Sequence, residues 1–171
     1  MEKVYQTYYQ SEIGLLGITG AGAKILSVEY LDPQIKGEAW PKRGRAPELP
    51  VLKEALIQID EYFKGLRQEF ELNLLLQGTD FQLMVWKELL EIAYGKTATY
   101  KEIASRIGKS KAARAVGGAA NRNKLAILIP CHRLVGTGGA LTGYAGGLWR
   151  KEWLLRWEGV ELDASSKRVM D

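Results

Sequence analysis

The only cysteine of this chain, Cys131, is followed directly by its only histidine, His132, in the stretch ILIPCHRLV (residues 127–135). A thiolate is a nucleophile, and an imidazole can take the proton that a thiol must first lose. In a regular strand, neighbouring side chains point to opposite faces, so this pair would need a turn or a bridging water to act together. The pair is a candidate nucleophile and base. An inert buried thiol at the end of an apolar run remains the alternative.

The same two residues limit which other sites the chain can hold. One cysteine cannot form an internal disulfide, and one cysteine with one histidine cannot by themselves supply four zinc ligands. We therefore expect no metal site and a cytoplasmic, reducing setting. The run LAILI (residues 125–129) is far shorter than the roughly 20 residues of a membrane-spanning helix, and the N-terminal residues lack the apolar segment of a signal peptide. No membrane partner is expected. With 46% hydrophobic residues the chain should be globular.

The N-terminal part of the chain has the residue pattern of a small sheet with one helix. Three β-rich runs predict strands at residues 3–10, 13–20 and 23–31. Residues 32–50 hold four of the five prolines and are predicted to be a loop. Apolar residues at helical spacing predict a helix over 51–63 that stops at Gly65, and alternation over 68–76 predicts a further strand. Residues 1–77 are thus expected to form a small, strand-rich α+β domain.

Residues 78–171 have the pattern of a mainly helical second domain. Thr79 is expected to cap a helix that ends at Gly95. The apolar stripe of this helix consists of Phe81, Val85, Leu89 and Ile92. The whole chain is therefore predicted to have an α+β fold, with the strand-rich domain first.

A helix-turn-helix is predicted within the second domain. Thr99 and Glu102 have the spacing of a capping box for a helix over 100–107, which Gly108 would end. Ser110 is expected to cap a second helix, KAARAVGGAANR. Two short helices joined by a glycine-containing turn are typical of this motif, although plain helical hairpins look the same.

The positive charge of the chain is concentrated on this motif. The formal net charge is +4, but residues 96–124 alone carry eight basic and one acidic side chain. Such a cluster fits contact with DNA phosphates, and a solvated face of lysines and arginines is the alternative. The second helix is also nearly free of large side chains, and two adjacent glycines cost about 1 kcal/mol each inside a helix. Either tight helix packing or entry into a narrow groove would explain that composition.

Several motifs, taken together and in order, resemble one family of DNA repair proteins. These are KAARAVGGAANRN, PCHRLV and GYAGGLWRKEWLLRWEG, and the match runs from about Thr79 to Gly159. This region is similar to the active-site region of the O6-alkylguanine-DNA alkyltransferases, which remove alkyl groups from guanine O6. The strand-rich N-terminal half is consistent with the ribonuclease-H-like domain of that family, with a less specific match.

The resemblance implies a single-turnover methyltransferase that needs no cofactor. Cys131 would accept the alkyl group in an in-line attack, and His132 would take the thiol proton through a water. Glu158 would orient His132, and Asn123 would brace the active-site turn. Tyr100 would donate a hydrogen bond to guanine N3 and help to rotate the nucleotide out of the duplex.

The resemblance also implies a DNA-contacting surface and a base pocket. Arg114 would fill the place that the flipped base leaves in the stack. Around Arg114 and Tyr100, the further residues expected at the DNA are Ser110, Lys111, Ala113 and Gly117. The alkylguanine pocket is expected to be formed by Leu134, Tyr144, Ala145 and Gly146. The partner would be double-stranded DNA containing O6-alkylguanine, bound by a monomer in the minor groove.

The sequence departs from the family pattern at a few points. Lys124 follows Asn123 where the family usually has proline. The zinc ligands of human-type N-terminal domains are absent, and so is a second, cysteine-rich domain.

Three rival functions are considered. One is that of an alkyltransferase-like protein, which binds the lesion without repair, but those proteins lack the acceptor cysteine that this chain keeps. The others are a cysteine hydrolase and a transcription regulator with an inert thiol.

Overall fold

The computed structural model describes residues 2–32 and 49–170, which form two compact units. The first unit consists of the chain up to Leu76 together with Lys124–Leu128, and the second of Gln77–Asn123 together with the chain from Ile129. The sequence predicts a division after residue 77 but does not foresee that Lys124–Leu128 joins the first unit. Most of the loop predicted over residues 32–50 lies outside the described residues.

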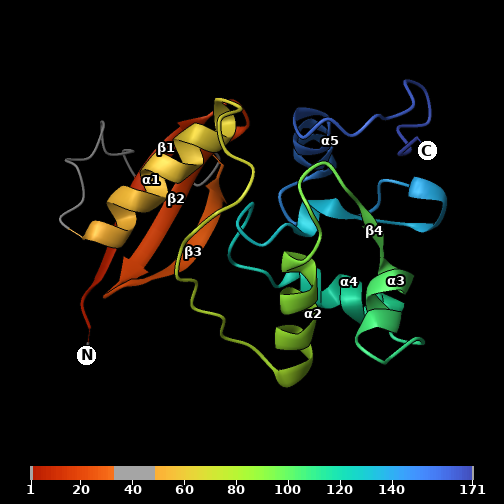
Figure 1. Cartoon of the computed structure of the whole chain (residues 1–171), viewed down its shortest axis with the longest axis horizontal. Coiled ribbons are helices and arrows are strands. Elements are labelled where there is room, and N and C mark those ends of the chain that lie inside the picture. The colour runs from red at the N-terminus through yellow and green to blue at the C-terminus, as the bar shows by residue number, and fades with distance from the viewer. Residues whose placement is uncertain (1, 33–48, 171) are drawn as a thin grey trace. The chain divides into compact units, whose positions relative to one another are not determined.

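The first unit is an antiparallel three-stranded sheet with one helix, and the first three strands and the helix lie where they were predicted. The strands β1 (Val4–Ser11), β2 (Gly14–Ala21) and β3 (Lys24–Leu31) follow one another as neighbours, and helix α1 (Pro50–Phe63) packs on the sheet (Figure 1). The core between sheet and helix consists of fully buried apolar side chains, among them Leu16, Ile18, Ile25, Leu52 and Ile59. The α+β class is confirmed for this unit.

The strand predicted over residues 68–76 is wrong. Only Leu74 forms a bridge, a parallel one to Ile25, with hydrogen bonds from Ile25 N to Asn73 O (2.8 Å) and from Leu75 N to Ile25 O (2.9 Å). Further along the same edge, the backbone of Val28 bonds to Lys124 O and to Ala126 N instead. Two short segments share the outer edge of β3, so neither can pair along its whole length.

The second unit begins with helix α2 (Asp80–Leu90), which carries the predicted cap. Thr79 and Gln82 form a complete capping box. The helix ends at Leu90 and not near Gly95. Glu91 N donates a hydrogen bond to Glu88 O, three residues back, and this bond tightens the final turn. Ile92 is buried as predicted, but it lies beyond the helix.

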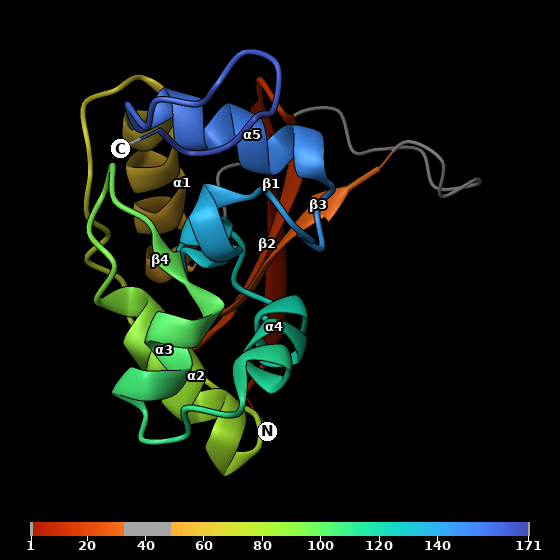
Figure 2. The same ribbon diagram turned by 90° about the vertical axis from the view of Figure 1, so that its right-hand side faces the viewer.

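Helices α3 (Tyr100–Arg106) and α4 (Ala113–Asn121) form the predicted helix-turn-helix. Gly108, with φ +73°, makes the turn after α3 in a conformation that favours glycine. Trp86 of α2 donates from Nε1 to Ala119 O at 2.9 Å, and α2, α3 and α4 form one group of helices (Figure 2). Ser110 does not cap α4: the N-cap is Ala112, because a turn from Ala112 N to Lys109 O delays the start of the helix.

These two capping predictions can be separated by a matched pair of variants. Thr99 Oγ1 accepts from Glu102 N at 3.1 Å, and Glu102 Oε2 accepts from Thr99 N at 2.6 Å. Thr99→Ala should lower the free energy of unfolding by about 1 kcal/mol in a urea titration. Ser110→Ala, which removes an exposed hydroxyl that caps nothing, should change it by less than about 0.5 kcal/mol. Equal costs would contradict this account of both residues.

The rest of the second unit leads from the central turn to the last helix. The short strands β4 (Ala98–Thr99) and β5 (Leu134–Val135) pair in parallel. A single 3-10 turn, η1 (Cys131–Arg133), precedes β5, and helix α5 (Leu148–Trp157) packs against η1. Among the described residues, no helix has the length and apolar character required to cross a bilayer.

Candidate functional site

Cys131 lies at the start of η1, and one side chain reaches it from the end of α4. The thiol is buried, with 7% of the residue exposed. Asn123 Nδ2 donates to Cys131 Sγ at 3.3 Å and to Ile129 O at 3.1 Å. Asn123 therefore contacts both the backbone that leads into the turn and the sulfur. Burial raises the pKa of the Cys131 thiol above its ordinary value, and the Asn123 hydrogen bond opposes that rise.

His132 pairs with Glu158, the residue that follows α5. Its Nε2 lies 2.8 Å from Glu158 Oε1, and both side chains are fully buried. An ionised carboxylate can only accept, so Nε2 carries the proton and Nδ1 of the neutral ring keeps a lone pair. That Nδ1 is buried and has no hydrogen-bond partner in the described part of the protein. His132 is thus oriented by Glu158 with its basic nitrogen unused, as a general base requires.

Arg133, the next residue, completes a buried charge cluster that sequence reasoning missed. Its Nε donates to Glu158 Oε2 at 2.8 Å, its Nη2 to Glu158 Oε1 at 2.9 Å, and its Nη1 to Ile92 O at 2.6 Å. Burial would raise the pKa of Glu158, but His132 and Arg133 together hold it well below the ordinary value. Glu158 therefore stays ionised at neutral pH and fixes the ring of His132.

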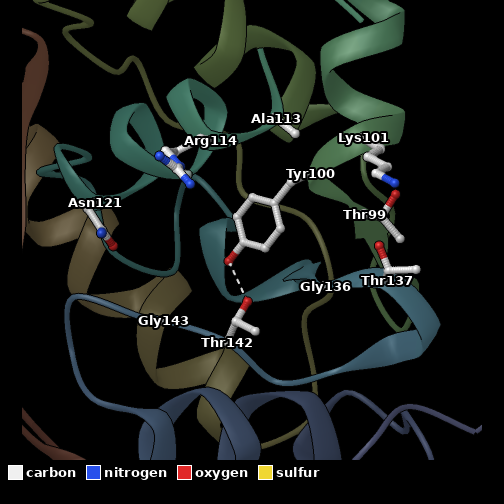
Figure 3. Close-up of a pocket in the computed structure, with 11 residues that line it drawn as sticks. Thr99, Tyr100, Lys101, Ala113, Arg114, Asn121, Gly136, Thr137, Thr142 and Gly143 are labelled. Atoms are coloured by element: carbon white, nitrogen blue, oxygen red, sulfur yellow. Dashed lines mark hydrogen bonds between the residues drawn. The ribbon is translucent and has the colours of Figure 1, made fainter. Parts of the chain in front are cut away.

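A pocket of about 420 Å³ lies between the helix-turn-helix and the loop that precedes α5. Figure 3 shows Tyr100 in its middle, with Arg114 and Asn121 on one side and Thr137 on the other. Thr142 Oγ1 hydrogen-bonds the Tyr100 hydroxyl at 3.3 Å. The remaining lining residues are Thr99, Lys101, Ala113, Gly117, Gly136 and Gly143. Four predicted DNA-contacting residues, Tyr100, Ala113, Arg114 and Gly117, therefore share one pocket.

The glycines of α4 are not required by packing within the protein. A Cβ placed on Gly118 would meet nothing within 4 Å, and one on Gly117 would make ordinary contacts at 3.5 Å and more with the Tyr100 ring. Tight helix packing, one of the two explanations for the small residues, is thus not found at these positions. The other explanation, a close approach by another molecule, stays a prediction.

Other predicted site residues lie outside the lining of this pocket. Ser110 and Lys111 are exposed in the turn before α4, Leu134 is fully buried in β5, and Cys131 lies within η1. Tyr144–Gly146 follow Thr142 and Gly143 on the loop, in a turn closed by a hydrogen bond from Gly147 N to Tyr144 O. Residues 142–146 thus continue from the pocket wall to the start of α5.

A second residue missed from the sequence is Lys151 on α5. The whole residue is buried, and its Nζ donates to Thr142 O at 2.8 Å and to Gly143 O at 3.2 Å. In the sequence, nothing in the stretch LWRKEWLLRW distinguishes this buried lysine from a solvated one.

In the described part of the chain, no three His, Cys, Asp or Glu side chains are grouped to hold a metal ion.

The two units match the two halves of one protein family. Residues 4–76 match the model of the 6-O-methylguanine DNA methyltransferase ribonuclease-like domain, and residues 80–160 match that of the 6-O-methylguanine DNA methyltransferase DNA binding domain. A methylated-DNA–protein-cysteine methyltransferase of Methanosarcina barkeri is 58% identical over 158 residues, which cover 91% of this chain and 97% of the relative. That of Mycobacterium leprae is 46% identical over 149 residues, covering 86% and 88%.

Solved structures match most of the chain. The crystal structure of Mycobacterium tuberculosis O6-methylguanine methyltransferase superposes with a TM-score of 0.78 at 38% identity, over 99% of this chain and 97% of that one. The structure of Mycobacterium tuberculosis OGT in complex with DNA gives a TM-score of 0.79 at 42% identity, over 90% and 92%. A two-part fold with a buried thiol beside a helix-turn-helix defines a DNA-binding methyltransferase class. This chain belongs to the 6-O-methylguanine DNA methyltransferase family.

Proposed function

We propose that this chain repairs DNA by taking the alkyl group of O6-alkylguanine onto its own Cys131. The observation that carries the proposal is the position of the only thiol. It is held by Asn123 next to a buried His132–Glu158 pair, in a chain whose relatives are named for methyl transfer to a protein cysteine. DNA as the partner is supported by the related structure solved with DNA.

The proposed reaction is a single displacement at carbon. The thiol proton passes through a water to Nδ1 of His132, whose Nε2 is held by Glu158. The sulfur then bonds to the alkyl carbon while the bond from that carbon to O6 breaks, and the electron pair stays with the guanine. Tyr100 donates to guanine N3 as charge develops, and the guanine takes up a proton. The sum is thiol plus O6-alkylguanine giving thioether plus guanine.

A buried thiol can meet a base of a duplex only if the base leaves the stack. Tyr100 and Arg114, which line one pocket with the small residues of α4, support this step. In the proposal α4 enters the minor groove, Arg114 occupies the gap, and Ser110, Lys111, Ala113 and Gly117 contact the DNA. The flipped guanine would lie against the backbone of Leu134 and of Tyr144–Gly146.

The proposed reaction consumes the protein. A thioether is stable, and the sequence holds no second cysteine that could discharge it. Each molecule should therefore act once. Monomeric state and a cytoplasmic location are predictions from the sequence that go with this proposal.

Intact-protein mass spectrometry after mixing with a duplex containing one O6-methylguanine tests the proposal. We expect a mass increase of one methyl group on Cys131, and a plateau of repair equal to the protein added. The unmodified duplex should leave the mass unchanged, and Cys131→Ala should bind the duplex without repairing it. Repair far beyond one equivalent would rule out the single-use reaction. Binding without any mass change would favour a lesion-binding protein or a regulator with an inert thiol.

A further inference from the structure

Lys151 is a buried lysine whose charge has no carboxylate partner in the described part of the protein. It is the fourth residue of α5 and is fully buried. Lysine is almost never fully buried unless its charge is paired. Among the described residues no aspartate or glutamate forms an ion pair with Lys151. The acidic neighbours on or next to α5 are engaged elsewhere, Glu152 with Arg156 and Lys167, and Glu158 with His132 and Arg133.

The contacts of Lys151 all lead to the pocket and its surroundings. Nζ donates to the carbonyl oxygens of Thr142 and Gly143, both of which line the pocket. It also lies 5.9 Å from the centre of the Tyr100 ring, whose hydroxyl is bonded by Thr142. An ammonium group has three N–H donors, and the two carbonyls use two of them. Lys151 thus ties α5 to the same loop wall that Tyr100 contacts.

We propose that Lys151 is a positioning residue of the alkyl-acceptor site: its ammonium fixes the Thr142–Gly143 wall and supplies the positive charge beside which the Cys131 thiol ionises. This inference rests on the proposed role of Cys131 as the acceptor. His132 takes the proton in this arrangement, and Lys151 stabilises the sulfur anion that is left. Helix α5, which carries Lys151, packs against η1, the turn that begins at Cys131, so the two groups stand on adjoining elements. The burial of Lys151 without a carboxylate partner among the described residues is explained if its counter-charge is the thiolate.

The electrostatics of the two groups are reciprocal. Burial lowers the pKa of Lys151 to about 8, and the negative charge of Cys131 works against that decrease. Conversely, burial raises the pKa of Cys131, and the charge of Lys151 is one of the influences that lower it. Several titratable and charged groups stand on the elements around Lys151. They are Cys131 and the His132–Arg133–Glu158 cluster, Tyr100, Lys101, Glu102 and Arg106 on α3, and Arg150, Glu152 and Arg156 on α5.

The coupling has a consequence for the repaired protein. A thioether carries no charge, so alkylation of Cys131 removes the anion that Lys151 faces. The pKa of Lys151 should then fall further, because burial is no longer opposed. At neutral pH a larger share of Lys151 would lose its proton, and with it part of its hold on the Thr142–Gly143 wall.

Titration of the single thiol tests the charge role without DNA. The thiolate is followed by its ultraviolet absorbance and by the rate of alkylation with iodoacetamide from pH 6 to 11. In Lys151→Met the midpoint of the thiol titration should rise by about one pH unit. At pH values below the midpoints of both the wild type and the variant, the alkylation rate of the variant should therefore be roughly tenfold lower. Lys167→Met removes an exposed lysine that pairs with Glu152, and its midpoint should equal that of the wild type. A midpoint unchanged in folded Lys151→Met would overturn the proposal.

A second measurement uses the wild-type chain and tests the coupling between Lys151 and Cys131 even if Lys151→Met does not fold. The lysine side chains are titrated by carbon-13 NMR, and the Lys151 signal is assigned by its absence in Lys151→Arg. Cys131 is then capped with methyl methanethiosulfonate, which leaves a small neutral disulfide. The Lys151 midpoint should fall by about one pH unit on capping. An unchanged midpoint would overturn the coupling, while the proposed DNA repair, which neither measurement involves, would stand.

Discussion

Glu158→Gln should lower the free energy of unfolding by about 3 to 5 kcal/mol and slow alkyl transfer roughly 10- to 100-fold. Glu158 accepts from His132 and twice from Arg133, and all three residues are buried. The neutral amide leaves a buried guanidinium without its counter-charge, which is the costly way to break a buried pair. It also removes the carboxylate that fixes the ring of His132. Urea titration and single-turnover transfer at saturating duplex measure the two effects.

The stability difference should depend on pH in a defined direction. The pKa of Glu158 is held below its ordinary value of 4.5, although burial opposes this, because His132 and Arg133 favour the ionised form. The unfolded chain binds a proton near pH 4.5 and the folded chain does not. The contribution of Glu158 is therefore fully present above that pH and is lost as the pH falls below it. The wild type and Glu158→Gln should thus converge in stability in acid.

The matched control is Glu152 on α5, the helix that Glu158 follows. Glu152 is partly exposed and pairs with Arg156 and Lys167 at the surface, so Glu152→Gln should cost less than about 1 kcal/mol and leave transfer unchanged. DNA binding should be preserved in both variants. Normal transfer rates in Glu158→Gln would remove Glu158 from the proton path.

Arg114→Ala should slow transfer on duplex DNA about tenfold or more and leave the reaction with free O6-benzylguanine nearly unchanged. If Arg114 fills the gap left by the base, its loss leaves part of the unstacking cost of a few kcal/mol uncompensated, and each 1.4 kcal/mol is tenfold in rate. The free base needs no unstacking. Arg114 lines the pocket beside Tyr100, which is consistent with a side chain that acts at the base (Figure 3).

Arg122→Ala is the control for loss of charge. Arg122 follows α4, is exposed and does not line the pocket. Rates are compared at saturating DNA, where an effect on affinity alone disappears. Arg122→Ala should then match the wild type. A defect of Arg114→Ala that saturation also removes would reduce Arg114 to a phosphate contact, and equal slowing on duplex and free base would give it a role in the fold.

The elements of this protein that could be predicted from sequence are those fixed by local interactions. Both capping boxes, at Thr79 and Thr99, depend on residues three positions apart, and the hairpin strands pair with their immediate neighbours. Ser110 had the right residue type for a cap, but a competing turn to Lys109 moved the start of α4. The strand expected over 68–76 failed because pairing at a sheet edge depends on what else occupies that edge.

The candidate site divides in the same way. Cys131, His132, Asn123 and Glu158 can be predicted because they stand in recognisable motifs. In the structure Asn123 contacts Cys131, and His132 contacts Glu158, which follows α5. Arg133 and Lys151 were missed, since a basic residue in a sequence looks the same whether it is solvated or buried. Only the tertiary fold shows that Arg133 donates hydrogen bonds to Ile92 O and Glu158, and that Lys151 donates to two loop carbonyls.

The segment Lys124–Leu128 means that no single cut divides this chain into its two units. A fragment ending at Leu76 would lack the segment and would leave the backbone of Val28 unpaired on an open sheet edge, a site for aggregation. A fragment starting at Gln77 would carry the segment, with its buried leucines, but no sheet to receive it. Those five residues stand between Asn123 and the turn that holds Cys131. Removing the N-terminal half would thus disturb the reactive thiol from within the remaining half.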